Sequence, residues 1–303
     1  MRTNTLEVRP RREDRIAADR SRLARSLAWT ILLLVSLTML APFIWMVLTA
    51  LKTEGEILRG DGLLPTEWRW QNFADALDAA PFGIYARNSL ILAAAHTLMT
   101  VTFAAATGYS LAKLRFRAAP WIFGGLLAAM MIPGYATIVP QFLMVRFMPL
   151  FGGNNVLGQG GIGWIDSWWG LIIPGGVTAF SIFLFRQFFT SVPTELLEAA
   201  RIDGVGEVGI FVRIASPQVL PAFLTAGLLS AENAWNNFLW PLLVTRSEEM
   251  RVIQVGLASF RQETTAQWTL MMAGTTLAML PMIVLFLLAQ RYFVQGFAQV
   301  GIK

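Results

Sequence analysis

Four polar residues stand close together in an otherwise apolar stretch of the sequence, and they are the first candidates for ligand chemistry. Glu232 and Asn236 are four residues apart, so they share one face of a helix. Asn233 and Asn237 form a second pair at the same spacing, on the adjacent face. Carboxamides beside an aromatic ring suit a hydroxyl-rich ligand such as a sugar. The alternative is that these side chains hydrogen-bond this helix to another membrane subunit.

Catalytic and phosphate-binding motifs are weak or missing. A P-loop requires a lysine directly after a glycine, and none of the three lysines in the chain follows one. Gly108–Ala112 is a poor match to the nucleophile elbow of a hydrolase, because no strand is expected before it. One histidine and no cysteine can form neither a zinc site nor a disulfide. We therefore expect no catalytic residue, bound metal or cofactor in this chain, and we interpret His96 as a residue that hydrogen-bonds one helix to another.

The elements that must position these residues are expected to be membrane helices. The chain of 303 residues is 55% hydrophobic and only 14% charged, with a mean hydropathy of +0.54. Five stretches without charge are each long enough to cross a bilayer as a helix, and a sixth contains only Glu232. The six candidate spans are Ser26–Leu51, Asn88–Ala112, Ala118–Val145, Ser167–Phe185, Gln218–Leu243 and Thr264–Gln290.

These spans predict an all-α membrane protein with six transmembrane helices. Residues 26–303 are expected to form one transmembrane domain, preceded by a charged tail of residues 1–25 that is not a cleaved signal peptide. An even number of spans places both termini on one side of the membrane. That side carries 16 of the 24 basic residues, so the positive-inside rule predicts that both termini are cytoplasmic. The net charge of +5 follows from this topology, and no nucleic-acid partner is expected.

Two loops on the expected outer side differ in composition. Residues 148–163 are rich in glycine and asparagine, which predicts an irregular or mobile loop. Residues 245–267 join the last two spans and carry several charges. We expect this second loop to be exposed.

A loop on the expected cytoplasmic side, residues 191–217, has a helix–turn–helix pattern. Ser191 is a candidate N-cap, and residues 195–202 predict about two turns of helix. Gly204 predicts the turn, after which a second short helix is expected.

The first helix of this loop has a surface that another protein could approach closely. Leu196, Ala199 and Ala200 are expected to share one face, and two of the three side chains are small. The alternative is a structural hairpin that only covers the membrane face.

A series of motifs, in order along the chain, resembles one family of membrane transport proteins. Glu198-Ala199-Ala200, followed by Gly204 and Pro217, resembles the EAA loop of ATP-binding-cassette (ABC) importer permeases. The neighbouring residues resemble the carbohydrate branch of that family, and its MalG-like subunit in particular. The resemblance covers about residue 26 to the C-terminus. The other matching motifs are Pro42–Met46, Asn88–Leu90, Gly108–Tyr109, Met131–Pro133, Phe185–Phe189, Ser191–Pro193, Phe238–Leu242 and Gln290–Val294.

The resemblance implies a type I ABC importer permease fold in the bacterial plasma (inner) membrane. It also implies that the loop of residues 191–217 is a coupling element that contacts ATPase subunits. The coupling residues that it implies are Glu195, Glu198, Ala199, Ala200, Arg201, Asp203 and Gly204. The polar group of Glu232, Asn233, Asn236 and Asn237 would then belong to the substrate pathway.

The implied complex has four further components. They are a second, MalF-like permease, two ATP-binding-cassette ATPase subunits that hold ATP and magnesium, and an extracytoplasmic sugar-binding protein. The chain would form half of a pathway for di- or oligosaccharides that opens alternately to either side of the membrane. Another small polar solute, such as a polyol or glycerol phosphate, is the alternative within this class. An ion-coupled secondary transporter is the alternative outside it, but the sequence lacks the internal repeat typical of such carriers.

Overall fold

The structure, a computed structural model, describes residues 12–60, 62–260 and 267–300, and the side chains of residues 25–60, 62–260 and 267–290. Every regular element in these ranges is a helix. The helices are α1 (Arg12–Ala50), α2 (Glu54–Arg59), α3 (Gln71–Asp78), α4 (Phe82–Met99), η1 (Thr100–Ala104), α5 (Ala105–Lys113), α6 (Ala119–Met131), α7 (Gly134–Arg146), α8 (Trp168–Ile172), α9 (Ala179–Thr190), α10 (Thr194–Ile202), α11 (Glu207–Gly209), η2 (Ile210–Ala215), α12 (Ser216–Gln218), α13 (Leu220–Asn236), α14 (Leu239–Val244), η3 (Glu248–Met250), α15 (Ile253–Ala258) and α16 (Trp268–Val300). The predicted all-α architecture is confirmed.

Three helical segments of the described chain are long and apolar enough to cross a membrane. They are residues 25–50 of α1, the continuous run Phe82–Lys113 and residues 268–290 of α16. Two bent pairs raise the number to as many as five, and α9 is a shorter apolar helix. The count of six spans therefore stays a prediction, although the positions of the apolar helices agree with it.

Three of the predicted spans are broken where one continuous helix was expected, and one of them, Gln218–Leu243, is interrupted at the extended Asn237 between α13 and α14. The span Ala118–Val145 bends by 107° between α6 and α7. Pro133 causes this bend, because the residue before a proline avoids the helical conformation, and Ile132 is extended with ψ of 122°. The span Ser167–Phe185 is also wrong as a single helix, since α8 ends at Ile172 and α9 begins only at Ala179.

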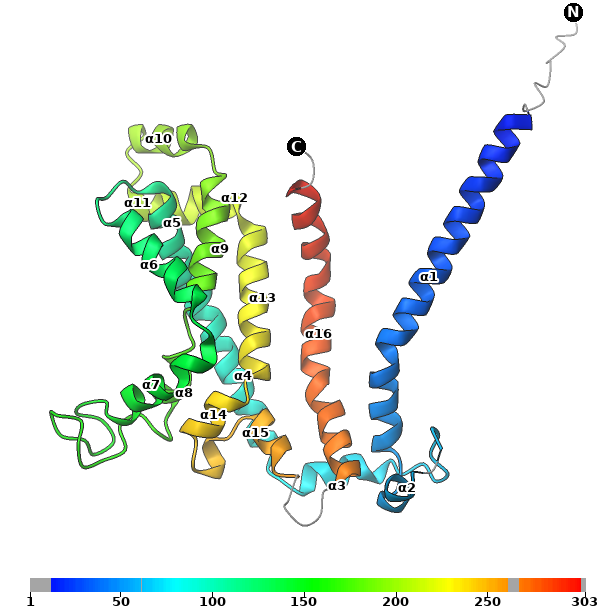
Figure 1. Ribbon diagram of the computed structural model, residues 1–303. Coiled ribbons are helices and arrows are strands. Elements are labelled where there is room, and N and C mark those ends of the chain that lie inside the picture. The colour runs from blue at the N-terminus through cyan, green and yellow to red at the C-terminus, as the bar shows by residue number, and fades with distance from the viewer. Residues whose placement is uncertain (1–11, 61, 261–266, 301–303) are drawn as a thin grey trace, which may run out of the picture.

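The loops gather at two opposite ends of the helices (Figure 1). One end holds α10, α11 and α12 together with the start of α1 and the end of α16. The other end holds α2, α3, α14, α15 and the loop that follows α7. This arrangement places the two ends of the described chain on the same side as the α10 hairpin. It agrees with the predicted sidedness of the loops, while the assignment of that side to the cytoplasm stays a prediction.

The helix α1 stands apart from the main group of helices, and α16 lies between them (Figure 1). Residues 25–45 of α1 are exposed along their whole length. Only the last turns of α1 are buried, where Ala50 packs with Ala76 of α3 and Ala273 of α16. An apolar helix with so little contact within its own chain must be covered by lipid or by another subunit.

Two glutamates of α2 hold this end of the structure together. The Glu54 carboxylate accepts hydrogen bonds from the backbone N–H of Trp268 (3.0 Å) and of Thr269 (3.1 Å), so it caps the first turn of α16. Glu56 accepts hydrogen bonds from Thr66 and from Thr53, and these lower the pKa of Glu56 to about 2. Both carboxylates are therefore held in place as hydrogen-bond acceptors in the segment that connects α1 to α3.

The loop of residues 245–267 was expected to be exposed, and for residues 252–260 this expectation is wrong. Val252, Ile253 and Phe260 are buried, because α15 packs against α4 and α16. The Asn88 side chain donates hydrogen bonds to the carbonyls of Glu249 (2.7 Å) and Arg251 (2.9 Å). Residues 261–266 lie outside the described chain.

The Gly-rich loop of residues 148–163 is irregular, as predicted, and it is held by many hydrogen bonds. Asn154 is buried, and its side chain donates to the carbonyls of Arg146 (3.1 Å) and Met148 (3.0 Å). Its Oδ1 accepts a hydrogen bond from the Gly161 N–H (2.8 Å). Gly152 needs its glycine, because its φ is +56° and a Cβ there would overlap the Gly163 backbone.

We expect Asn88→Ala to destabilise the packing of α15 and the residues before it on α4. The substitution removes the donor to two backbone carbonyls, and each unsatisfied buried group costs about 1–3 kcal/mol. The apparent Tm of the purified protein in detergent should fall. Gln71→Ala, which removes an exposed hydrogen bond to Asp75, should leave the Tm unchanged. Equal Tm values for Asn88→Ala and the wild type would contradict this account of the loop.

The topology can be tested with single cysteines, because the natural chain has none. Val156 is exposed in the Gly-rich loop, and Ala118 is exposed in the basic loop between α5 and α6. In intact cells a membrane-impermeant maleimide should label Val156→Cys and leave Ala118→Cys unlabelled until the cells are opened. The reverse labelling pattern would show that the predicted orientation is inverted.

Candidate functional site

The candidate site is the helix hairpin of residues 191–218, which begins one residue after α9 ends. Ser191 was expected to cap the first hairpin helix, and this expectation is wrong. Ser191 instead caps the C-terminus of α9, where its Oγ donates to the Phe188 carbonyl (2.7 Å). The first hairpin helix, α10, begins at Thr194 after the extended Pro193. Proline suits this boundary, since it has no N–H that a helix would need to satisfy.

The helix α10 has one buried face and one exposed face. Leu197 and Ala200 are buried against the rest of the chain. Leu196 and Ala199, which were expected to share a face with Ala200, point outwards instead. Glu195, Glu198, Asp203 and Gly204 are also exposed, and Arg201 is half-buried.

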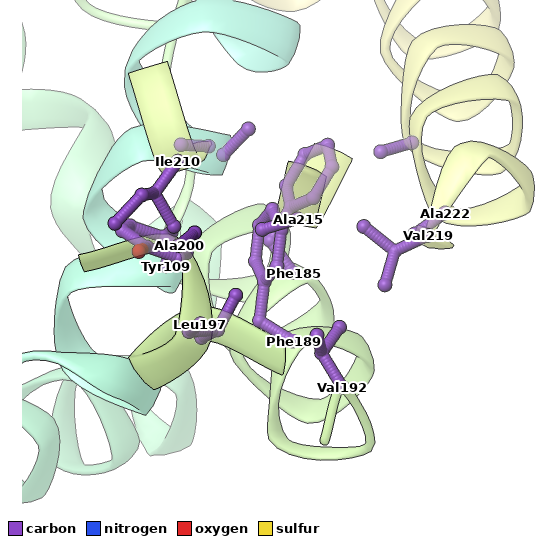
Figure 2. Packing of buried hydrophobic residues seen from close by; sticks show 13 residues of the cluster. Tyr109, Phe185, Phe189, Val192, Leu197, Ala200, Ile210, Ala215, Val219 and Ala222 are labelled. Atoms are coloured by element: carbon purple, nitrogen blue, oxygen red, sulfur yellow. The ribbon is translucent and has the colours of Figure 1, made fainter. Parts of the chain in front are cut away.

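A cluster of buried apolar side chains joins the hairpin to the ends of α5, α9 and α13. Phe185 and Phe189 of α9 are fully buried in it, and Phe189 lies edge-on to Tyr109 of α5 with ring centroids 5.4 Å apart. Figure 2 shows these rings between residues of the hairpin and the first residues of α13. The buried members of this hairpin core are Ala104, Ala105, Tyr109, Phe185, Phe189, Val192, Leu197, Ala200, Ile210, Ala215, Val219, Ala222 and Ala226.

Close packing of α5 on α9 extends this core into the apolar part of the protein. A Cβ at Gly108 would lie 2.6 Å from the Cβ of Phe185 and 2.8 Å from the backbone nitrogen of Arg186. Small residues at such a crossing let two helix backbones approach, as is typical of helix pairs in membranes. The hairpin is thus packed on a rigid pair of helices.

Polar contacts also fix the hairpin at its base. The Arg201 guanidinium donates to both carboxylate oxygens of Glu207, with Nε–Oε1 of 2.6 Å. The hydrogen bond with Glu207 raises the pKa of the Arg201 guanidinium. Glu207 also accepts a hydrogen bond from the Tyr109 hydroxyl (3.3 Å). The Lys113 ammonium donates to the carbonyls of Val192 (2.6 Å) and Thr190 (3.3 Å). The sequence analysis missed the contacts of Tyr109, Lys113 and Glu207.

The turn of the hairpin requires a glycine at position 204. Gly204 has φ of +82°, in the left-handed region. Its N–H donates to the Arg201 carbonyl (3.1 Å), and the Val205 N–H donates to the Ala200 carbonyl (3.0 Å). This pair of bonds is a Schellman motif, which ends α10 sharply and sets the direction of α11.

The hairpin exposes apolar as well as charged side chains. Ile202 at the end of α10 is 86% exposed, and Val208 of α11 is 77% exposed. Glu198 of α10 and the C-cap residue Asp203 are exposed as well. Large exposed apolar side chains near charged ones are typical of a protein-docking surface. The geometry therefore supports contact with another protein.

The four polar residues of the fifth predicted span do not form one site. Asn236 Nδ2 donates to Glu232 Oε1 (2.9 Å), and both side chains are exposed. Asn237 Oδ1 accepts a hydrogen bond from the Trp240 N–H (3.3 Å) in the first turn of α14. Asn233 is exposed and makes no side-chain hydrogen bond within the described chain. In the same helix Trp235 is buried, and its Nε1 donates to the Ala278 carbonyl of α16 (3.1 Å).

Three relatives are similar to this chain over most of its length. The arabinooligosaccharides transport system permease protein AraQ of Bacillus subtilis (strain 168) is 35% identical over 89% of this chain and 93% of that protein. The lactose transport system permease protein LacG of Rhizobium radiobacter is 30% identical over 91% of this chain and 96% of that protein. The sn-glycerol-3-phosphate transport system permease protein UgpE of Yersinia pestis bv. Antiqua (strain Antiqua) is 32% identical over 77% of this chain and 81% of that protein.

A solved structure shares the fold. A chain of a bacterial ABC transporter involved in the import of the acidic polysaccharide alginate matches with a TM-score of 0.76 and 22% identity. The match covers 94% of this chain and 99% of that one. The family described as "binding-protein-dependent transport system inner membrane component" matches residues 101–299, which include the whole hairpin. This chain therefore belongs to the family of inner membrane components of binding-protein-dependent ABC transport systems.

Proposed function

We propose that this chain is the permease subunit of an ATP-driven importer of di- or oligosaccharides. It forms half of the translocation pathway, and a second, MalF-like permease forms the other half. Two separate ATPase subunits bind ATP and magnesium, and an extracytoplasmic sugar-binding protein delivers the solute. The family membership supports the transport role, and the names of AraQ and LacG support a sugar as the solute.

The hairpin carries this proposal, because it joins a docking surface to the helix bundle through a buried core. Glu195, Glu198, Ala199 and Gly204 lie on its exposed side, where an ATPase subunit would contact them. Leu197 and Ala200 on its other side pack on Phe185 and Phe189, so a push on the hairpin moves α9 and α13. Arg201 and Asp203 shape the turn, and Arg201 ties it to Glu207.

The mechanism that fits this arrangement is alternating access. ATP binding would draw the two ATPase subunits together and carry the hairpin of each permease with them. The helices packed on the two hairpins would then turn and open the pathway towards the binding protein. Hydrolysis by the ATPase subunits would return the pathway to the cytoplasmic side.

A glycerol phosphate importer is the second candidate, because UgpE is 32% identical to this chain. The polar side chains at membrane depth favour an uncharged solute. Asn233 and Asn236 offer amides, while the one carboxylate among them, Glu232, would repel a phosphate. Uptake assays that compare labelled lactose, arabinotriose and sn-glycerol 3-phosphate in the complete complex separate the two candidates.

We expect Ala199→Arg to abolish transport while the protein remains in the membrane. Ala199 is exposed, so arginine fits the fold of the chain but blocks close approach of another protein. Co-purification of the ATPase subunits should fall, and sugar uptake should be lost. The matched control is Ala79→Arg, at an exposed alanine on the opposite end, which should transport normally. Normal uptake by Ala199→Arg would mean that the hairpin is only a structural cover.

We expect Gly204→Val to uncouple the complex through the backbone of the turn. Position 204 has a left-handed backbone, which costs a β-branched residue about 1–2 kcal/mol, although no atom blocks the side chain. Gly206→Val is the matched control, since Gly206 has φ of −68° and open space around it. Sugar uptake and ATPase recovery should fall for Gly204→Val and stay near wild type for Gly206→Val. Equal losses in both variants would contradict a specific role for the turn.

A further inference from the structure

A cavity within the apolar part of the protein has a mixed lining, in which polar side chains stand among apolar ones. It has a volume of about 260 Å³ and lies between α4 with η1, the first half of α9 with the residues before it, and α13. His96, Thr100, Ser181, Ser230 and Asn233 bring polar atoms to it. A larger cavity of about 930 Å³ between α4, α13 and α16 differs sharply, because apart from Thr97 its lining is apolar.

His96 is the buried group that marks the polar cavity as a site. Its side chain is 5% exposed, and its Nε2 has no hydrogen-bond partner in the described chain. A Cβ at Gly175 would lie 2.7 Å from Cε1 of His96, so glycine makes room for the imidazole. His96 was expected to hydrogen-bond one helix to another, and its imidazole does bond to the backbone of Leu171 and Ile172 in α8, which leaves only Nε2 without a partner. In a membrane interior an unpaired nitrogen is costly unless water or a ligand reaches it.

The other polar atoms of the cavity are held in place and still have bonding capacity. The hydroxyls of Thr100 and Ser230 are 3.0 Å apart, and those of Thr178 and Ser181 are 2.7 Å apart. Each hydroxyl oxygen has a donor and two acceptor positions, so neither pair is saturated. The amide of Asn233 stands at the exposed side of the cavity with both its donor and its acceptor free.

We propose that this cavity is a subsite of the translocation pathway that holds one hydroxyl-bearing ring of the transported sugar. Neutral hydroxyls, an imidazole nitrogen and a carboxamide match hydroxyl groups, which both donate and accept hydrogen bonds. Phe180 at the cavity is 48% exposed, and its ring offers an apolar surface to the face of a sugar ring. The volume fits part of an oligosaccharide rather than a whole one. This inference rests on the proposed function.

The exposed polar face of α13 indicates how the sugar reaches the cavity. Asn233 follows Glu232 and lies on the same exposed part of the helix as Asn236. Of these residues only Asn233 also lines the cavity, so it stands where the polar face meets the subsite. The outer half of α13 would then face the shared pathway, with the second permease on the opposite side.

The test uses the complete complex in proteoliposomes, with binding protein and ATPase subunits, and with lactose and arabinotriose as labelled probes. His96→Leu, Ser230→Ala and Asn233→Ala should each raise the KM for sugar uptake at least tenfold and keep the basal ATPase rate within twofold. His96→Gln, which restores a hydrogen-bonding group, should recover part of the loss. Thr97→Val is the matched control, because Thr97 of α4 lies one turn before Thr100 of η1 and lines the apolar cavity.

The outcomes separate the subsite from the proposed function. If the wild type imports either sugar and all three cavity variants keep its KM, the cavity is structural and the inference is overturned. If Thr97→Val loses uptake as strongly as His96→Leu, the effect is one of folding, and the inference is again overturned. If the wild type imports sn-glycerol 3-phosphate and neither sugar, the sugar function itself fails and the subsite fails with it.

Discussion

The packing of the hairpin on the ends of α5, α9 and α13 is the interaction on which the rest of the structure depends. Phe185 and Phe189 belong to the second half of the apolar helix α9, and both are fully buried in the hairpin core. Because interiors of this kind are close-packed, they transmit a displacement instead of absorbing it. Gly108 allows α5 to pack directly on Phe185, so the hairpin and the helix ends beneath it form one closely packed unit. Under the proposed function, this core is the part of the chain that would carry a displacement of the hairpin into the helix bundle.

The membrane imposes the second constraint, since polar groups at its depth must find partners. Most do so within the chain: Trp235 donates to Ala278, and the hydroxyl of Thr100 lies beside that of Ser230. The groups that lack partners are therefore informative. The buried His96 Nε2 and the exposed Asn233 amide lie at one cavity, so two groups with free hydrogen-bonding capacity meet there. In the hairpin, the exposed apolar side chains likewise indicate a surface that needs a partner.

Much of this arrangement could be predicted from the sequence, because hydropathy and turn signals are local. The positions of the apolar helices, the hairpin and its left-handed glycine at Gly204 were all predicted correctly. The breaks within three predicted spans were not, because hydropathy does not register where a residue such as Pro133 turns the chain. The burial of α15 was also not predicted, because the charged residues around it in the sequence indicated an exposed loop.

The residues of the candidate sites were predicted less accurately than the helices, because a site depends on contacts between segments that are far apart in the sequence. Ala199 and Glu198 are exposed as a docking surface requires, but Leu196 and Ala200 point in different directions. The cavity at His96 joins segments about 80 and 130 residues apart in the sequence, and no periodicity could bring them together. The only local signal was a lone histidine in an apolar helix, which is equally typical of a structural role.

The most direct test of the central claim measures whether the hairpin and the bundle move as one body. Spin labels at Val212→Cys in the second half of the hairpin and at Leu220→Cys at the start of α13 occupy exposed positions away from the proposed docking surface, and the distance between them can be followed by electron paramagnetic resonance. In the complete complex, this distance should stay the same with and without ATP. The distance from Val212→Cys to a label on the partner permease, at the end far from the ATPase subunits, should change. A shift or broadening of the first distance on ATP binding would show a hairpin that moves independently of the helices, and would contradict the account.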